Sequence, residues 1–174
     1  GIRKSAKWLY DYLRGGDHKN PLGLVENAQD TQVLEESPDR CLLFVGDLMG
    51  TNGKKIVFQE DIRDWSKECD HVIGNLEGPL WNSTDIVFVK QHNTEERLKD
   101  FSELAPLKKW IFSLANNHIY DYGPEGVQAT TETIEKLGAS WIGLSERPKI
   151  TIHDVDIWAA TTFSNVANER VFYF

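Results

Sequence analysis

The sequence has few of the features that mark several large classes of protein. Only two of its 174 residues are cysteines, too few for a disulfide framework, so we expect Cys41 and Cys69 to be buried or half-buried thiols. No apolar run approaches the roughly 18 residues that span a membrane, and no signal-peptide core is present. The 19 basic and 27 acidic residues give a net charge of −8. That balance disfavours a nucleic-acid partner, because such binding needs a basic face.

What the sequence does contain is typical of one globular domain preceded by a short extension. Apolar residues are 40% of the chain and charged residues 26%. Apolar side chains recur at helical spacing over residues 1–16, and residues 17–40 are polar and without a period. We therefore expect an N-terminal helix and arm over residues 1–40 and a domain over residues 41–174.

From residue 41 onward, predicted strands and helices alternate. The continuous apolar run over residues 41–45 predicts a strand that is buried on both faces. Further strands are expected over residues 71–73, 110–115 and 140–144, a strand or long loop over 86–89, helices over 59–68, 94–105 and 124–138, and a hairpin over 150–162. This order predicts an α/β fold with a mixed β-sheet flanked by helices.

Two of the predicted strands end in oxygen-bearing side chains. Asp47 follows the first strand, and Asn75 and Glu77 follow the second. Ligands of α/β sheets bind outside the carboxyl ends of the strands, so these groups are expected to meet if the strands are parallel neighbours. Carboxylate and amide oxygens suit Mg²⁺ or Mn²⁺, and an added imidazole extends the range to Fe or Zn.

The strand over residues 110–115 ends in a denser polar group. Asn116, Asn117 and His118 follow it directly, with Asp121 close behind. A histidine beside a metal site can protonate a leaving oxygen, and a carboxylate can orient its ring. Asn116 is assigned no role beyond turn chemistry. Because Asp and Asn also favour turns after strands, a purely structural interpretation of all these groups stays open.

Three stretches of the sequence resemble a known family. "LLFVGDLMG", "GNLEGPL" and "LANNHIYDYGPEGVQATTETIEKLGASWIGLSE" are similar to the bacterial capsule synthesis family of the CapA type, which is associated with poly-γ-glutamate capsules. The resemblance covers residues 41–163. That family is similar in fold to the calcineurin-like metallophosphoesterases, so the resemblance implies part of their two-sheet sandwich.

The resemblance also implies a role for each strand-end residue. Those in the positions of metal ligands are Asp47, Asn75, Glu77 and Asn117. His118 stands at the position of the histidine that faces the leaving group, and Asp121 is expected to orient it. The implied chemistry is hydrolysis of a phosphate ester, in which two divalent ions (Mn, Mg, Fe or Zn) activate a water.

Two departures from the phosphoesterase pattern bear on this interpretation. That pattern begins Asp-x-His, whereas the third position here is Met49, whose thioether is a poor ligand for a hard ion. The later histidine motifs do not occur. The one histidine after His118 is His153, which we expect to be a solvated turn residue. The domain is therefore expected to be incomplete at its C-terminus, either the first half of a longer domain or a short form.

The sequence leaves more than one function open. One is a metal-dependent phosphoesterase acting on a phosphate ester. Another is a non-catalytic partner of the capsule-synthesis machinery, which binds cations or an anionic polymer during assembly or export. A structural fragment with only turn chemistry is a third. The resemblance implies a place in the cell envelope or at the extracellular face.

Overall fold

The computed structural model describes residues 40–49, 56–82, 90–166 and 170–172. All of them belong to the second of two compact units, which spans residues 39–174. The N-terminal helix, nearly all of the arm after it and the segment 86–89 lie outside the described residues. Within the described part of the chain, no helix is long and apolar enough to cross a membrane.

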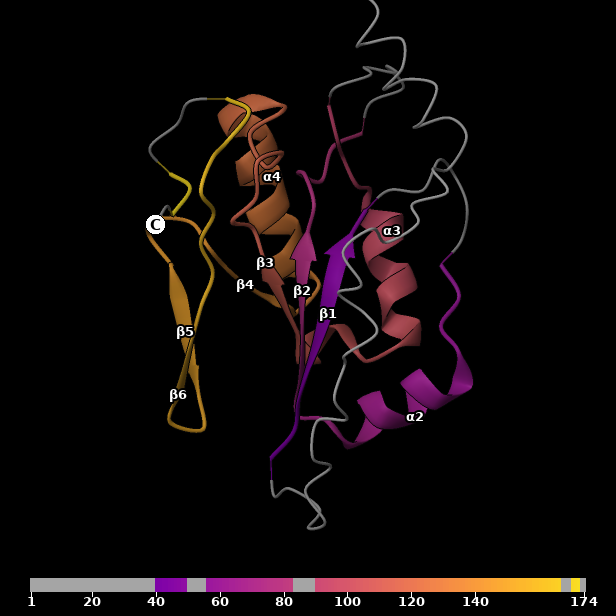
Figure 1. Cartoon of the computed structure of the whole chain (residues 1–174). Helices are drawn as coiled ribbons and strands as arrows, with labels where there is room; N and C mark the ends of the chain where they lie inside the picture. The colour runs from indigo at the N-terminus through magenta and orange to yellow at the C-terminus, as the bar shows by residue number, and fades with distance from the viewer. Residues whose placement is uncertain (1–39, 50–55, 83–89, 167–169, 173–174) are drawn as a thin grey trace, which may run out of the picture. The chain divides into compact units, whose positions relative to one another are not determined.

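Among the described residues, four parallel strands form the central sheet, and their order in the sheet is their order in the sequence (Figure 1). They are β1 (Leu42–Leu48), β2 (His71–Leu76), β3 (Trp110–Ser113) and β4 (Ser140–Ile142). The connecting helices are α2 (Glu60–Glu68), α3 (Glu95–Asp100) and α4 (Gly123–Lys136), with 3₁₀ turns at Phe101–Glu103 and Leu107–Lys109. The expected α/β class with flanking helices is confirmed.

The hairpin forms a second sheet of its own. Strands β5 (Lys149–Ile152) and β6 (Val155–Trp158) pair with each other in antiparallel fashion. The parallel and antiparallel strands thus lie in two sheets rather than in one mixed sheet, because the hairpin packs on a face of the central sheet. His153 lies in the hairpin turn with a positive φ of 50°, and its ring is 3.5 Å from Asp70. The expectation of a turn residue there is confirmed.

One face of the central sheet is covered by helices. Alternate residues of β2 and β3, such as Val72 and Phe112, pack against Leu98 of α3 and Ile134 of α4, and all four side chains are fully buried. Trp110 stacks on Phe112 with the ring centroids 5.3 Å apart. The apolar stripes that predicted α3 and α4 are the residues that fill this core.

The opposite face of the sheet is covered by the hairpin. Ile73, Ile111 and Ile142 pack there against Ile152 of β5 and Ile157 of β6. These residues alternate along their strands with the residues of the helix-covered face, as the period of two in a strand requires. The sheet therefore separates two apolar cores, and each of its faces lines one of them.

The prediction that the first strand is buried on both faces is wrong. β1 is the edge strand of the described sheet, and its Phe44 side chain is 62% exposed. The hairpin covers the part of the face formed by β2, β3 and β4, so it buries little of β1. A groove of about 310 Å³ opens there between Phe44 and Trp158 of β6, and Asn75 also lines it.

The prediction of two thiols is also wrong, because Cys41 and Cys69 form a disulfide. Cys41 directly precedes β1, and Cys69 lies shortly before β2. Since Leu42 and His71 are partners in the parallel register, the residues that precede the two strands are neighbours. The backbone N–H of Asp70 also donates a hydrogen bond to the Cys41 carbonyl at 2.8 Å, which joins the same two segments.

Candidate active site at the carboxyl ends of the strands

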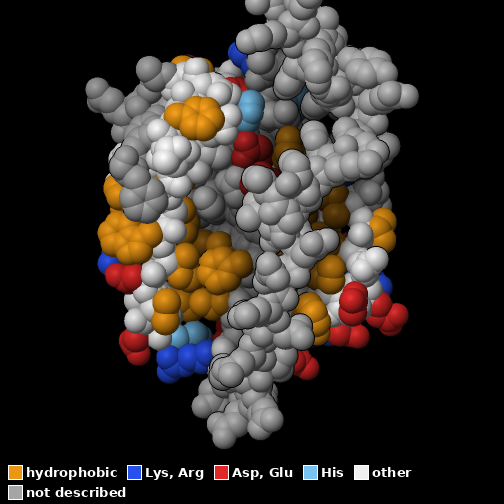
Figure 2. All heavy atoms as spheres, in the orientation of Figure 1, with side chains coloured by type: hydrophobic (Ala, Val, Ile, Leu, Met, Phe, Trp, Pro, Cys, Tyr) orange, Lys and Arg blue, Asp and Glu red, His pale blue; other side chains and the backbone are white. Residues whose placement is uncertain are grey.

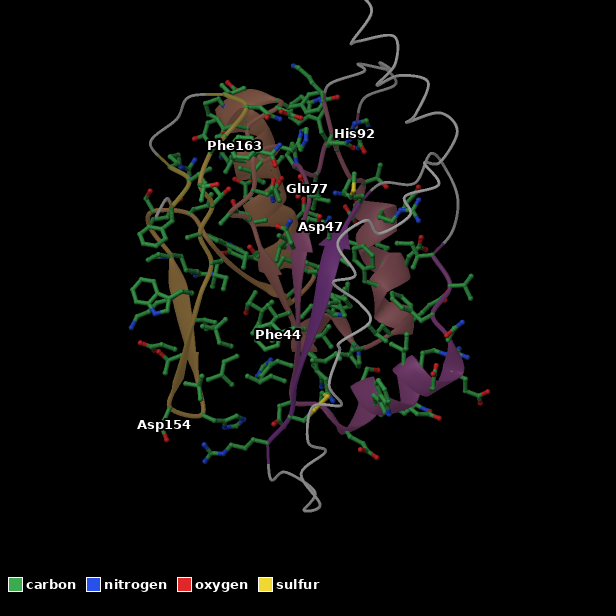
Figure 3. All side chains as sticks on the ribbon, viewed as in Figure 1. Phe44, Asp47, Glu77, His92, Asp154 and Phe163 are labelled. Carbon is green, nitrogen blue, oxygen red and sulfur yellow. A yellow bond between two sulfur atoms is a disulfide. The ribbon has the colours of Figure 1, made fainter. Side chains whose placement is uncertain are left out.

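The parallel sheet brings the predicted polar residues to one edge. Asp47 of β1 is the register partner of Asn75 of β2, and Asn75 is the partner of Ser113, the last residue of β3. The loops after β2 and β3 then carry Glu77 and His118. Figure 3 shows Asp47 and Glu77 close together at the ends of β1 and β2, and Phe44 lower on the sheet.

A single amide group links the two carboxylates. The Nδ2 atom of Asn75 lies 2.8 Å from Asp47 Oδ1 and 2.8 Å from Glu77 Oε2, and donates a hydrogen bond to each. Hydrogen bonds to charged acceptors are among the stronger ones in proteins. Asn75 therefore keeps two like charges near each other without a direct contact between them.

Asn116 fixes which end of the Asn75 amide faces the carboxylates. The Asn116 side chain is buried, and its Oδ1 accepts hydrogen bonds from the backbone N–H groups of Gly78 and His118. Its Nδ2 donates to the Leu76 carbonyl at 2.8 Å and to Asn75 Oδ1 at 3.2 Å. Because the backbone partners leave one orientation for Asn116, they also determine the orientation of Asn75.

This arrangement adds to what the sequence suggested for both asparagines. The bond from His118 N–H to Asn116 is the expected turn, but the same amide also joins the end of β3 to the end of β2. As placed, Asn75 offers its nitrogen to the carboxylates and its oxygen to Asn116. The role of Asn75 as an oxygen ligand of a metal remains a prediction, and its present geometry is that of a donor.

His118 and Asp121 form a close pair beside the carboxylates. His118 Nδ1 lies 2.7 Å from Asp121 Oδ2, and the side chain of Asp121 is only 4% exposed. The same Asp121 oxygen accepts the backbone N–H of Gln91 at 2.7 Å. A carboxylate at this distance accepts a hydrogen bond from Nδ1–H, which leaves Nε2 as the ring nitrogen without a proton in the neutral imidazole. Nε2 faces Glu77, with 3.9 Å to its Oε1.

Asn117 contacts a residue that the sequence analysis missed. Its side-chain Nδ2 donates to Asn165 Oδ1 at 3.2 Å, and its carbonyl accepts the Asn165 backbone N–H at 3.0 Å. Asn165 Nδ2 is also 3.1 Å from His118 Nδ1. Asn165 lies in no motif, and only the fold brings it to the site from the segment after β6. The role of Asn117 as a metal ligand remains a prediction.

Electrostatics at the site raise the pKa of Glu77. Burial of its carboxyl is the main cause, and the hydrogen bond from Asn75 works in the opposite direction. The nearby carboxylates of Asp47 and Asp121 raise the pKa further, whereas His118 lowers it. Figure 2 shows acidic side chains gathered with a histidine beside them, above an apolar patch on the same face. A positive charge placed here would relieve the repulsion among the carboxylates.

The carboxylates of Asp47 and Glu77 lie on either side of one hydrogen-bond donor. Each has an oxygen 2.8 Å from the Asn75 nitrogen. These two carboxylates would hold a hard cation such as Mg²⁺ or Mn²⁺. Among the residues that the structure describes, however, no three His, Cys, Asp or Glu side chains are grouped to hold a metal. Oxygen ligands from amides would have to complete the set.

Comparison with known proteins identifies the family. The model of the family described as bacterial capsule synthesis protein PGA_cap matches residues 41–164, more than half of the chain. The chain is also 27% identical over 128 residues to the capsule biosynthesis protein CapA of Bacillus anthracis. That match covers 66% of this chain and 30% of the CapA protein, so the chain spans less than a third of its relative. With its α/β sheet and its strand-end cluster, the chain belongs to the bacterial capsule synthesis protein family PGA_cap.

Proposed function

We propose that this chain carries a metal-dependent phosphoesterase site of a capsule synthesis protein. The observation that supports the proposal most directly is the His118–Asp121 pair, 2.7 Å apart, beside two carboxylates that share one hydrogen-bond donor. An imidazole held by a buried carboxylate, next to acidic groups at the carboxyl edge of a parallel sheet, is an arrangement suited to acid catalysis. The substrate class is a phosphate ester, and the relative's name suggests a role in making capsule.

In this proposal Asp47 and Glu77 hold the cation. When bound, a divalent cation would supply a Lewis acid for the phosphoryl oxygens. Asn75 keeps the two carboxylates at a fixed separation, and Asn116 holds Asn75 in place. Because these residues are joined by hydrogen bonds in the chain itself, the site is organised before any ligand arrives.

The proton for the leaving group comes from His118. With Nδ1–H donating its hydrogen bond to Asp121, a protonated ring carries its second proton on Nε2. Nε2 gives this proton to the ester oxygen as the P–O bond breaks and water supplies the new oxygen to phosphorus. One proton of the water stays on the phosphate and the other returns to the neutral ring, so the products are an alcohol and inorganic phosphate and the protonated His118 is restored.

Metal content and ester hydrolysis test the proposal together. The purified chain and Asp47→Ala would be incubated with Mn²⁺, desalted, and measured by elemental analysis and with an aryl phosphate ester. We expect metal and hydrolysis in the wild type and the loss of both in Asp47→Ala. Asp64→Ala, which removes an exposed carboxylate of α2, is the matched control and should behave as the wild type. Equal metal and equal hydrolysis in Asp47→Ala would refute the proposal.

A second function is favoured by the small number of charged ligands. Among the described residues no three His, Cys, Asp or Glu side chains are grouped to hold a metal, so in this second proposal Asp47 and Glu77 would be the charged ligands of one cation. A non-catalytic capsule protein could use such a cation to bind an anionic polymer, which a chain of net charge −8 would otherwise repel. Binding of poly-γ-glutamate that needs Mn²⁺ and is abolished by a chelator, without ester hydrolysis, would favour this function over the first.

A further inference from the structure

We propose that Asn165 is a positioning residue of the site, which holds Asn117 and His118 in their working orientations. The inference deepens the proposed function and rests on it for the meaning of those two residues. Asn165 lies one residue beyond the end of the family match, at residue 164. The segment that carries it follows β6, the last strand of the second sheet.

Three contacts join Asn165 to two consecutive residues of the site. Its backbone N–H donates to the Asn117 carbonyl at 3.0 Å, and its Oδ1 accepts from Asn117 Nδ2 at 3.2 Å. Its Nδ2 lies 3.1 Å from His118 Nδ1. The partners are 47 and 48 positions apart in the sequence, so these contacts are not local turn chemistry. Backbone and side chain of one residue both attach to the loop after β3.

The Asn165 side chain also lies beside Nδ1 of His118, the ring nitrogen that contacts Asp121. Nδ1–H donates to Asp121 Oδ2 at 2.7 Å, so Asn165 Nδ2, which is also a donor, makes no hydrogen bond to Nδ1 across the 3.1 Å between them. Asn165 acts on the ring through the Asn117 carbonyl, which belongs to the peptide group that joins Asn117 to His118, and through contact with the edge of the ring. The other ring nitrogen, Nε2, is thereby directed toward Glu77, with 3.9 Å to its Oε1.

The segment that carries Asn165 is itself fastened to the fold. The Thr161 backbone N–H donates to the Phe172 carbonyl at 3.1 Å, and Phe172 N–H donates to Gly143, just after β4. Asn165 is therefore presented from a tethered segment, and the part of the chain after the hairpin completes the site. Phe163 belongs to the same segment, but its side chain is 58% exposed.

The test compares Asn165→Ala with Phe163→Ala as the matched control. The first readout is the pair of ring-nitrogen NMR signals of His118, in a chain labelled with ¹⁵N-histidine, at one pH and without added metal. In Asn165→Ala we expect both signals to move toward the averaged values of two exchanging tautomers, because a less firmly placed ring makes its Nδ1–H bond to Asp121 for less of the time. Phe163→Ala should leave them in place. Asn165→Ser is the second variant, should the alanine variant fold poorly.

The second readout is the dissociation constant for Mn²⁺, measured from the signal of free Mn²⁺. Asn165→Ala is expected to weaken binding by about tenfold, because Asn117, a predicted ligand that would complete the set of Asp47 and Glu77, loses the partner that places it. Unchanged ring signals in Asn165→Ala would overturn the inference, whatever the metal does. If the wild type binds no Mn²⁺ but the ring signals still move, the proposed phosphoesterase function fails and the positioning role stands.

Discussion

The two faces of the central sheet are covered to different degrees. On the helix-covered face, Val72, Trp110 and Phe112 are completely buried. On the hairpin-covered face, burial ends before β1, where Phe44 is 62% exposed and the groove beside Trp158 opens. The comparison separates two tasks. The helix-covered face supplies most of the apolar burial that stabilises the domain, and the other face leaves room next to the site, because Asn75 lines the groove.

The largest expected effect comes from a cavity in the helix-covered core. Phe112→Ala removes a buried ring that stacks on Trp110 and should lower the free energy of unfolding by about 4 kcal/mol. Phe44→Ala, the same change on the other face, should alter it by no more than about 0.5 kcal/mol. Urea unfolding of both variants measures the difference. Losses of similar size would mean that the two faces do not differ in this way.

A smaller loss is expected from removing the covalent link of the edge strand. The disulfide closes a loop of 28 residues, so Cys41→Ser combined with Cys69→Ser should cost about 3 kcal/mol of unfolding free energy. Because β1 has little cover on the hairpin side, amide hydrogen exchange should accelerate in β1 more than in β3. Equal acceleration in both strands would show that β1 is held by its neighbours and not by the link.

The smallest effect on stability is expected at Glu77, at the carboxyl ends of the strands, and it depends on pH. The pKa of Glu77 is raised in the folded chain, so ionising this carboxyl favours the unfolded state. The resulting loss of stability is absent below the ordinary pKa of 4.5 and develops as pH rises through the raised value. With metal removed by a chelator, Glu77→Gln should therefore be slightly more stable than the wild type at pH 7.

That advantage should disappear near pH 4, where the wild-type carboxyl is protonated as well. Thermal unfolding of the two proteins across this range provides the measurement. A Glu77→Gln variant that is less stable than the wild type at pH 7 would contradict the expected direction of the pKa shift. It would indicate that the charged form of Glu77 is supported by Asn75 and His118 more strongly than burial opposes it.

The regular elements could be predicted because their signals are local. The apolar spacing of Leu98 and Phe101 belongs to one continuous stretch, α3 and the 3₁₀ turn after it, and Pro124 and Gly138 lie near the ends of another helix. The sheet edge that gathers Asp47 and Glu77 followed from the general placement of ligands in α/β sheets. Each of these inferences needed only neighbours in sequence and one rule about topology.

What could not be predicted depends on contacts between distant residues. The exposure of Phe44 follows from the place of β1 at the edge of the sheet, and the Cys41–Cys69 bond follows from the register of β1 with β2. Asn116 and Asn165 gain their roles from partners on other elements. The cysteines did carry a usable signal, since each stands just before a predicted strand, but it required knowing that those strands are neighbours.

Because Cys41 and Cys69 form a disulfide, the same sequence can exist as an oxidised and as a reduced protein. Protein made in a reducing cytoplasm and protein that has met an oxidant are two compounds, and the reduced one is heavier by two hydrogen atoms. They differ at the junction of Cys41 and Cys69, at the start of the strand that carries Asp47. Samples of one sequence from different expression hosts would thus differ in stability, and an intact mass would identify which form is present.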